Sequence, residues 1–564
     1  PMDKLVKSSN FFYNEMYYAN TYSVLTLSKS GELINLLSDG FYKIDLNNYD
    51  QKEYLDQVLY PNVSSTVEMN LNDLEASIQN NGFMYSDKNR QSNFNFMPAL
   101  KLKSEPCNNI AFSHGIWIGA KNNNDSSIKV SRSTYESDSN EYAPGPINVI
   151  TGNFDSTLTV DYNRFWKIKR YEVEDFKLNR NNSGYIIPKN ILDWPGNGNS
   201  KTITKMAPYV DTDNDQKYDP TKGDYPDMKG DMMFWWVFND NVAHRAGRNL
   251  KFQINASCYA YHDKNLTPSD SNFLINRTLL FDYEFINCSG QNQKEVIIGL
   301  FNDEDIGNYS DDAVSFDSAS STVFAYNGDD YDDLYINKGF GFNPPILSTQ
   351  FLNQNLFKFV RQSGGMPLFN DPTFSYNLMI AKGDEGKPYN QTQMSLFNHT
   401  PCESDTDFYI PTDIRYLMSL KAGDLAPLAS YKLTFANYIQ YNSSINYLNQ
   451  DCNKTLLNAN KIKQWYINGN FPSDPVWPLN VNDIKTAGND FKVYPNPTSQ
   501  ILNFDWADQT QYEIKVYDLN GKLCLNTQLT ENNQSIDVSQ LVSGVYFIMA
   551  ISDSGLVSSK FVKN

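Results

Sequence analysis

The sequence predicts a mainly β protein, with one or two β-sandwich-like domains that include a short helical segment and a further small β-sandwich at the C-terminal end. Aromatic residues form 14% of the 564 residues, with 37 Tyr and 34 Phe, and both types favour strands. Asn, Asp, Gly and Pro recur between the apolar segments, where they favour turns. Apolar residues alternate with a period of two in several segments, as a strand with one buried face requires.

Charge and hydropathy exclude several classes of function. The formal net charge is −18, so a phosphate backbone would be repelled and no nucleic-acid partner is expected. The longest apolar segment, residues 232–238, has the length of a strand and is too short for a transmembrane helix. The first residues lack the apolar core of a signal peptide, so we expect such a signal to have been removed or to lie outside this chain.

Length and composition divide the chain into four parts. A chain of 564 residues is too long for one ordinary domain. We expect a β-rich N-terminal region at 1–160, a sandwich-like main domain with acidic loops at 161–476, a linker at 477–490 and a separate unit at 491–564. The linker is polar, rich in small residues and without periodicity, which is typical of a flexible connection.

Strands are predicted throughout the first two parts. Residues 116–120 place Ile, Ile and Ala on one face and Trp and Gly on the other, which predicts a strand over 110–120. Further strands are predicted at 17–28, 156–162, 232–238, 252–261, 277–288, 294–301, 414–420 and 430–441. Residues 350–400 are predicted to be irregular.

Two segments depart from the β pattern. Residues 171–178 are compatible with a short helix. Residues 445–469 place Leu456 and Ile462, among other apolar residues, at roughly helical spacing, and Gly469 is a plausible end. We expect one amphipathic helix, or two, that packs on the sandwich.

The cysteines do not indicate a disulfide scaffold. Six cysteines are few for a chain of this length. Cys258 and Cys288 lie in neighbouring strand-like segments, so they either pair across a sheet or remain buried free thiols.

The last segment, 491–564, has the pattern of a compact antiparallel sandwich. About seven strand-like segments follow one another, with proline or glycine turns between them, as in a small immunoglobulin-like sandwich. The clearest turn is Asn520-Gly521, which alternating apolar residues flank. This dipeptide favours a two-residue hairpin because both positions accept a positive φ.

The same segment resembles the type A C-terminal sorting domain of proteins that the type IX secretion system of Bacteroidetes exports. Four motifs carry the resemblance in the family's order and spacing: Tyr494-Pro495-Asn496-Pro497, Tyr517-Asp518-Leu519-Asn520-Gly521-Lys522, Ser543-Gly544-Val545-Tyr546 and Lys560-Phe561-Val562-Lys563. The resemblance covers about an eighth of the chain. It implies an export signal that the outer-membrane translocon and its shuttle protein recognise. In that family the domain is usually cleaved, and the cargo is then released or attached to a surface lipopolysaccharide.

The remainder of the chain is similar, at short landmarks only, to large surface proteins that carry the same tail and have no assigned activity. These landmarks lie at 115–119, 141–147, 193–196, 207–211 and 223–227. The similarity implies a type of cargo and no particular chemistry.

An acidic loop, DTDNDQKYDP at 211–220, has the spacing of a calcium-binding loop. Asp211, Asp213 and Asp215 match its positions one, three and five, the Lys217 carbonyl matches position seven, and Asp219 matches position nine. Ca²⁺ prefers oxygen ligands, and closely spaced carboxylates repel one another without a cation. Outside the cell, even a loop of weak affinity can be occupied.

The loop departs from an EF-hand at two positions. Gln216 stands where the glycine of position six would be, and Lys222 where the glutamate of position twelve would be. We therefore expect an Asp-rich loop of the kind found in extracellular repeats, with Asp224 or Asp227 as a sixth ligand. The alternative is a solvated acidic turn without an ion.

Two more acidic clusters follow in the main domain. After the strand that ends at Phe301, a second cation is predicted within a ring of acidic and amide side chains: Asp303, Asp305, Asn308, Asp311 and Asp312. A third cluster lies at 327–333. Solvated loops remain the alternative for each, but together the three clusters suggest a loop face that calcium, the expected cofactor, stiffens.

No catalytic residue is nominated. The chain has four histidines and no HExxH, GxSxG or P-loop motif. A glycoside hydrolase needs only two carboxylates, and 65 acidic residues neither exclude nor identify such a pair.

Five tryptophans are candidates for a surface that stacks on sugar rings: Trp117, Trp166, Trp194, Trp235 and Trp236. Trp235 and Trp236 lie in an apolar segment and are expected in the core. Trp194, which stands beside a turn, is the candidate for an exposed platform.

The sequence therefore predicts a secreted or cell-surface protein without enzymatic activity, structural or adhesive in role, exported through its C-terminal segment. Its expected partners are the type IX translocon and shuttle protein, with glycans or further copies of the chain as additional possibilities through sheet edges. The alternative is a secreted carbohydrate-active protein, either a glycan-binding module or a glycoside hydrolase.

Overall fold

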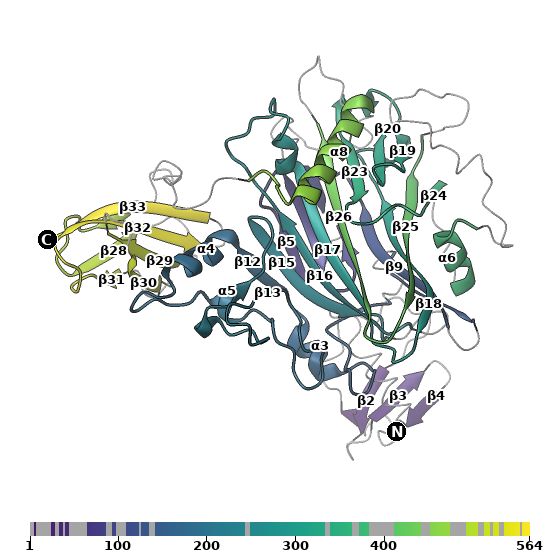
Figure 1. Ribbon diagram of the computed structural model, residues 1–564, viewed down its shortest axis with the longest axis horizontal. Helices are drawn as coiled ribbons and strands as arrows, with labels where there is room; N and C mark the ends of the chain where they lie inside the picture. Colours follow the sequence, from purple (N-terminus) through teal and green to yellow (C-terminus); the bar gives the residue numbers. More distant parts are fainter. Residues whose placement is uncertain are drawn as a thin grey trace. The chain divides into compact units, whose positions relative to one another are not determined.

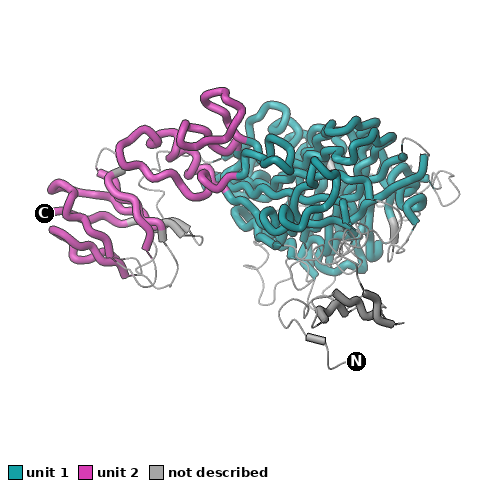
Figure 2. The backbone as a smooth tube through the Cα atoms, turned by 90° about the horizontal axis from the view of Figure 1, so that it is seen from below, with its two compact units in different colours: residues 1–167, 195–208, 228–474 teal, residues 168–194, 209–227, 475–564 magenta. Residues whose placement is uncertain are grey.

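The computed structural model separates the chain into two compact units (Figure 2). Unit 1 comprises residues 1–167, 195–208 and 228–474, and unit 2 comprises residues 168–194, 209–227 and 475–564. The structure describes the following residues: 65–85, 93–96, 109–122, 126–134, 141–242, 249–332, 339–363, 371–382, 411–441, 452–473, 492–505, 512–518, 523–529, 535–552 and 555–564, together with four N-terminal strands, β1 (Leu5–Val6), β2 (Val24–Ser28), β3 (Leu33–Leu37) and β4 (Gly40–Lys43).

The first large sheet of unit 1 has nine antiparallel strands. Their order is β24-β25-β18-β9-β7-β6-β5, with β10 paired to β9 and β8 paired to β6. The strands are β5 (Thr66–Met69), β6 (Leu74–Gln79), β7 (Phe83–Met84), β8 (Phe94–Phe96), β9 (Ser113–Asn122), β10 (Ile128–Arg132), β18 (Gln293–Asp303), β24 (Lys358–Ser363) and β25 (Ile414–Leu425).

The second large sheet of unit 1 runs in the order β11-β15-β16-β17-β26-β23-β20-β19. The strands are β11 (Ala143–Pro144), β15 (Met232–Asn239), β16 (Phe252–Ala260), β17 (Thr278–Asn287), β19 (Asp312–Asp317), β20 (Thr322–Asn327), β23 (Ile346–Phe351) and β26 (Ser430–Gln440). Shorter elements of unit 1 are η4 (Phe273–Arg277), η5 (Tyr309–Asp311), β21 (Tyr331–Asp332) and β22 (Gly341–Phe342), and β12 (Trp166–Lys169) lies where the chain passes into unit 2.

The two sheets face each other across one hydrophobic core (Figure 1). Alternate residues of each strand point inward, as Ile116 and Ile118 do on β9 and Phe234 and Trp236 do on β15. A sandwich of this kind follows from the period-two pattern, because successive side chains of a strand point to opposite faces. The mainly β, sandwich-like fold predicted from the sequence is confirmed.

Two helices cover the outer faces of this sandwich. α6 (Pro372–Met379) packs Tyr376 and Met379 against Trp117 and Phe301 of the first sheet. α8 (Cys452–Asn468), predicted from its apolar spacing, packs Ala459 on Phe324 of the second sheet. In Figure 1, α6 lies near β24 and α8 lies beside β23. Strands beneath these helices, such as β9 and β18, are therefore buried on both faces over most of their length.

The segment 156–162 was predicted as a strand and is a helix, α3 (Ser156–Tyr162). Asp155 ends the preceding extended segment, and its Oδ1 accepts hydrogen bonds from the N–H groups of Thr157 at 3.0 Å and Leu158 at 3.3 Å. A side chain that satisfies the first N–H groups in this way is a strong helix start. Leu158 and Tyr162, four residues apart, are buried, whereas Val160 is exposed, so the buried face has the helical period.

The region 350–400, predicted as irregular, contains β24 and α6 among its described residues. Asp371 caps α6 through the Thr373 N–H at 2.8 Å, and Pro372 occupies the first turn, where a missing N–H costs nothing. The boundary expected at residue 160 lies inside unit 1, since β9 and β18 are neighbours in one sheet.

Unit 2 combines two segments from the middle of the chain with the C-terminal end. The middle segments contain α4 (Arg170–Asn179), which was predicted, α5 (Lys189–Leu192), β13 (Tyr209–Val210), η3 (Pro220–Lys222) and β14 (Tyr225–Pro226). The C-terminal module, residues 492–564, has two small sheets, β27-β28-β31 and β30-β29-β32-β33. Its strands are β27 (Lys492–Tyr494), β28 (Ile501–Asp505), β29 (Tyr512–Tyr517), β30 (Leu523–Leu529), β31 (Ser535–Asp537), β32 (Gly544–Ser552) and β33 (Gly555–Lys563).

The C-terminal module has its own hydrophobic core. Eleven buried residues form it, and all of them come from within the module: Leu502, Phe504, Ile514, Val516, Leu529, Ile536, Val538, Tyr546, Ile548, Ala550 and Phe561. The small β unit predicted for 491–564 is thus a separately packed sandwich within unit 2.

Candidate functional site

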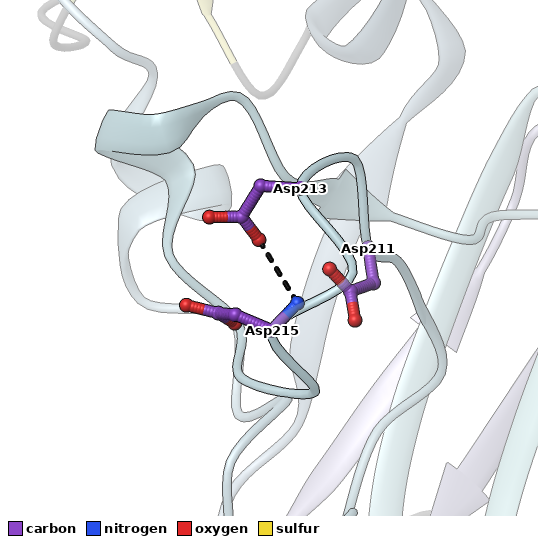
Figure 3. Close-up of side chains that lie close together, drawn as sticks. All are labelled: Asp211, Asp213 and Asp215. Carbon is purple, nitrogen blue, oxygen red and sulfur yellow. Dashed lines mark hydrogen bonds between the residues drawn. The ribbon is translucent and has the colours of Figure 1, made fainter.

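The first predicted cation site is the acidic loop between β13 and η3. One carboxylate oxygen from each of Asp211, Asp213 and Asp215 lies within 4.8 Å of the other two (Figure 3). The loop's own N–H groups orient these carboxylates, since Gln216 donates to Asp211 at 2.8 Å and Asp215 donates to Asp213 at 3.3 Å. Asn214 and Gln216 have φ of 60° and 61°, which gives the loop its tight curvature.

A lysine already neutralises two of these three carboxylates. Lys222 Nζ lies 2.5 Å from Asp215 and 3.4 Å from Asp213. The hydrogen bond from Lys222 lowers the pKa of Asp215 and, in return, Asp215 and Asp213 raise the pKa of Lys222. The departure from an EF-hand at position twelve therefore places an ammonium group where a divalent ion would need to compete.

Asp219 and Asp224, also predicted for this loop, do not join the group of three carboxylates. Asp219 caps η3, accepting from the Thr221 N–H at 2.9 Å. Asp224 is fully buried and accepts from the N–H groups of Thr212 at 2.8 Å and Asp219 at 2.9 Å, so both of its oxygens hold the loop closed. Lys217 is exposed and its N–H donates to Asp215 at 2.8 Å.

The second predicted site lies in unit 1, where β18 ends. One carboxylate oxygen from each of Asp303, Asp305 and Asp413 lies within 4.8 Å of the other two. Arg415 contributes a positive charge there, with Nε 3.2 Å from Asp303 and Nη1 2.9 Å from Asp413. Three carboxylate oxygens at this spacing can share one hard cation such as Ca²⁺.

Asp312 adds a fully buried carboxyl group to this cluster. Its Oδ2 accepts from the Ile306 N–H at 3.0 Å, whereas Oδ1 has no hydrogen-bond donor among the described residues. Burial raises the pKa of Asp312 well above its usual value, and the charges of Asp305, Asp332 and Asp311 raise it further. Such a group must be protonated at neutral pH or have a cation nearby, so the residues present fit a bound cation.

The structure brings two acidic residues to this cluster that the sequence did not place there. Asp332, from the separate cluster predicted at 327–333, is buried on β21 and accepts from the Asn308 N–H at 3.1 Å. Asp413 precedes β25, and the pairing of Arg415 with Asp303 in register brings it to the end of β18. A sequence pattern could locate Asp413 only if the pairing of β18 with β25 were already known.

His114 and Glu304, a histidine–acid pair of a kind that catalytic sites also use, lie buried inside the sandwich. His114 Nε2 lies 2.9 Å from Glu304, to which the Tyr416 hydroxyl also donates at 2.7 Å. Tyr416 lies 3.2 Å from Thr349 on the opposite sheet, and Asn437 donates to Thr349 at 2.7 Å.

Tyr85 closes this set of contacts into a ring. Its hydroxyl donates to Asn437 at 2.7 Å, and its aromatic ring meets that of His114 edge-on at 4.6 Å. The six side chains, His114, Glu304, Tyr416, Thr349, Asn437 and Tyr85, are all completely buried. We refer to them as the inter-sheet polar ring.

The five tryptophans that were candidates for sugar stacking are buried. Trp194, the candidate for an exposed platform, is 3% exposed, which corrects that expectation. It follows α5, and its N–H donates to the Ile191 carbonyl at 3.4 Å. The other four, Trp117, Trp166, Trp235 and Trp236, are each 7% exposed or less.

Cys258 and Cys288 are buried free thiols, so the open choice between pairing and free thiols is resolved. Burial raises the pKa of the Cys288 thiol to about 12, and that of Cys258 also lies well above its usual value.

The first and last motifs of the C-terminal module meet at one end of its sandwich. Asn496 binds β33 through both ends of its amide, donating to the Lys560 carbonyl at 3.0 Å and accepting from the Val562 N–H at 2.9 Å. Tyr494, Pro495, Asn496 and Pro497 are exposed around two cis peptide bonds, Tyr494–Pro495 and Asn496–Pro497.

The third motif supports this end from inside. Tyr546 stacks on Phe561 with ring centroids 5.5 Å apart, and its hydroxyl donates to the Val542 carbonyl at 2.9 Å. Gly544 begins β32 opposite Lys563. Asn520 and Gly521, the predicted hairpin turn, lie outside the described residues.

A family model described as a secretion system C-terminal sorting domain matches residues 492–564. The chain carries a C-terminal sorting domain. It is therefore cargo of the type IX secretion system, and it is secreted to the cell surface or the extracellular space. Among the helices that the structure describes, none has the length and apolar character needed to span a membrane.

Two further comparisons say little about the rest of the chain. No curated protein matches the chain. Among solved structures, a polysaccharide lyase shares 10% sequence identity over 55% of this chain and 34% of the lyase, with a TM-score of 0.18. The chain thus spans about a third of that lyase's length, and a likeness at this level carries no argument about fold or activity.

Proposed function

We propose that the part of this exported chain that precedes the sorting domain, called the body below, acts as a structural or adhesive surface protein. We further propose that calcium bound at the end of β18 stiffens it. The observation that carries the proposal is that the side chains best suited to sugar stacking or catalysis are buried. Five tryptophans and the His114–Glu304 pair are buried in packing and hydrogen bonds. These side chains therefore stabilise packed interiors and do not face solvent, where a glycan or substrate would need them.

Calcium is proposed at the cluster of Asp303, Asp305 and Asp413, next to buried Asp312. Support comes from the spacing of the three carboxylates and from the Asp312 oxygen that has no hydrogen-bond donor among the described residues. An ion there would link the loop after β18 to the segment before β25, which are distant in sequence. At the loop of Asp211 the same ion would first displace the Lys222 ammonium, so we expect weaker binding there.

Cell attachment tests the role of the body. Cells that lack the chain should adhere less to one another and to solid surfaces, and full-length protein should restore adhesion. A chain that ends before residue 492 is the matched control: it has the same body but no sorting domain, so we expect it to remain inside the cell without restoring adhesion.

Activity assays on the exported protein provide the opposing outcome. Purified protein should release no reducing sugars from a panel of polysaccharides and should bind none of them in an affinity gel. Polysaccharide cleavage or retention by the protein, together with unchanged cell attachment, would show that the carbohydrate-active alternative is correct.

A further inference from the structure

One lysine of the sorting domain lies on a face that a free domain would expose. On β29, Ile514 and Val516 point into the domain's own core. Side chains alternate along a strand, so Lys515, between them, points to the outer face of that sheet. Lys515 is nevertheless only 2% exposed. Something outside the domain's core must cover it.

The cover is α4, from the middle of the chain. Lys515 Nζ lies 3.3 Å from Asp175 Oδ2, and Asp175 is itself 3% exposed. The Tyr185 hydroxyl donates to the same Asp175 oxygen at 2.7 Å, and Asn179 donates to the other oxygen at 3.0 Å. A carboxylate with three partners of this kind is fully committed to the contact.

The surrounding side chains are consistent with a docked face. Met549, which pairs with Lys515 across the sheet, is 7% exposed although it also points away from the domain's core. Tyr517 and Glu513 share that face, and Glu513 lies 3.7 Å from Lys515. The outer face of β29 and β32 is therefore covered where it meets residues 168–194.

The docking segment is also fixed in place independently of the sorting domain. Glu172 accepts from the Lys169 N–H at 2.8 Å, which caps the start of α4, and from Asn190 on α5 at 2.8 Å. The segment thus presents Asp175 from a preorganised surface, which lowers the entropy cost of binding.

We propose that residues 168–194 are a docking platform for the sorting domain, and that the buried Asp175–Lys515 pair locks the two together. A peptide cut between the body and the domain would then leave both parts associated. The platform covers the face of the domain that carries Lys515. The exposed end at Asn496 and Lys560 remains accessible to the secretion system.

Cutting the full-length chain tests this proposal. A specific protease site placed between residues 474 and 492 allows cleavage of the folded protein, followed by gel filtration at micromolar concentration. We expect the fragment 492–564 to elute with the body. Separate elution of the two wild-type fragments, each folded, would overturn the proposal.

Two substitutions test the lock itself. Lys515→Met removes the ammonium group and leaves the buried Asp175 carboxylate without a positive charge beside it. Asp175→Asn removes the charge from the platform without changing the sorting domain. Loss of one partner of a buried pair weakens association by roughly a hundredfold or more, so the cleaved variants should separate.

Lys492→Met is the matched control, because Lys492 is an exposed lysine of the same domain, and its fragments should stay together. Asp175→Asn keeps the test valid if Lys515→Met impairs folding of the domain. If the two fragments of cleaved Asp175→Asn protein elute together, as the wild-type fragments do, the pair does not lock the contact.

Discussion

Replacing Asp305 with asparagine should remove roughly half or more of the stabilisation that calcium gives to unit 1. Asp305 belongs to the group of three carboxylates and raises the pKa of buried Asp312. In the presence of a chelator, Asp305→Asn should be at least as stable as wild type, because the substitution removes a like charge beside Asp312. In calcium the order should reverse, because the variant has lost a ligand.

The size of the effect follows from mass action. Extracellular calcium sites have dissociation constants of about 10⁻⁴ to 10⁻³ M, so about 10 mM calcium stabilises the folded state by about 1.4–2.7 kcal/mol. Unit 1 has about 430 residues, and its entropy of unfolding converts this to a rise in Tm of about 1.5–3 °C. A tenfold loss of affinity in Asp305→Asn should reduce the rise by roughly half or more.

Tryptophan fluorescence is the appropriate assay, because Trp117, Trp235 and Trp236 are buried in unit 1 and report its unfolding. Thermal melts are compared in calcium and in chelator. Asp330→Asn, at an exposed residue outside the group of three, is the control and should respond to calcium like wild type. Equal melting of the wild type in both buffers, or a full calcium response in Asp305→Asn, would refute the reasoning.

Three further predictions follow from the packing and charges described. Gly115→Ala should lower the free energy of unfolding by about 1–3 kcal/mol or more, measured by chemical denaturation, because the added Cβ would lie 1.9 Å from the Ser133 carbonyl oxygen. Cys288 should resist alkylation at pH 8, since its pKa of about 12 keeps the thiol protonated; peptide mapping by mass spectrometry should show half-buried Cys524 labelled first. Lys222→Met should increase the calcium affinity of the Asp211 loop severalfold in calorimetric titration, because the competing ammonium group is removed.

Each of these has a contradicting outcome. An unchanged denaturation midpoint in Gly115→Ala would mean that β9 has room which the structure does not show. Equal labelling rates for Cys288 and Cys524 would show that burial does not protect the former. A calcium affinity that stays constant or falls in Lys222→Met would mean that the ammonium group does not occupy the ion's position.

The strands of the main body were predictable because each carries its own pattern. The segments 252–261, 277–288 and 430–441 are long, apolar and bounded by turns, and each forms a strand of the second sheet. The helix α3 was not recognised, since Leu158, Val160 and Tyr162 alternate like a strand. The decisive feature was local but outside that alternation: the Asp155 carboxylate satisfies the first N–H groups of the helix.

Contacts between segments that are distant in sequence limit how much of the sites could be predicted from the sequence. The spacing of Asp211, Asp213 and Asp215 is local, so the sequence alone could predict that they lie together. Asp413 reaches Asp303 only through strand pairing, and Lys515 reaches Asp175 across 340 residues. No spacing rule within one segment reports such pairs, because tertiary folding decides which strand faces meet.

The inter-sheet polar ring has a consequence for the alignment of the sandwich. Apolar faces of two sheets attract each other without direction, so neighbouring alignments would bury similar areas of carbon. The hydrogen bond between the Tyr416 and Thr349 hydroxyls and the one from Tyr85 to Asn437 cross the gap between the sheets. A shift of one sheet by a single residue would leave these hydroxyl and amide groups buried without hydrogen-bond partners, which is energetically costly. The inter-sheet polar ring thus selects one alignment of the two sheets from many that would bury a similar apolar area.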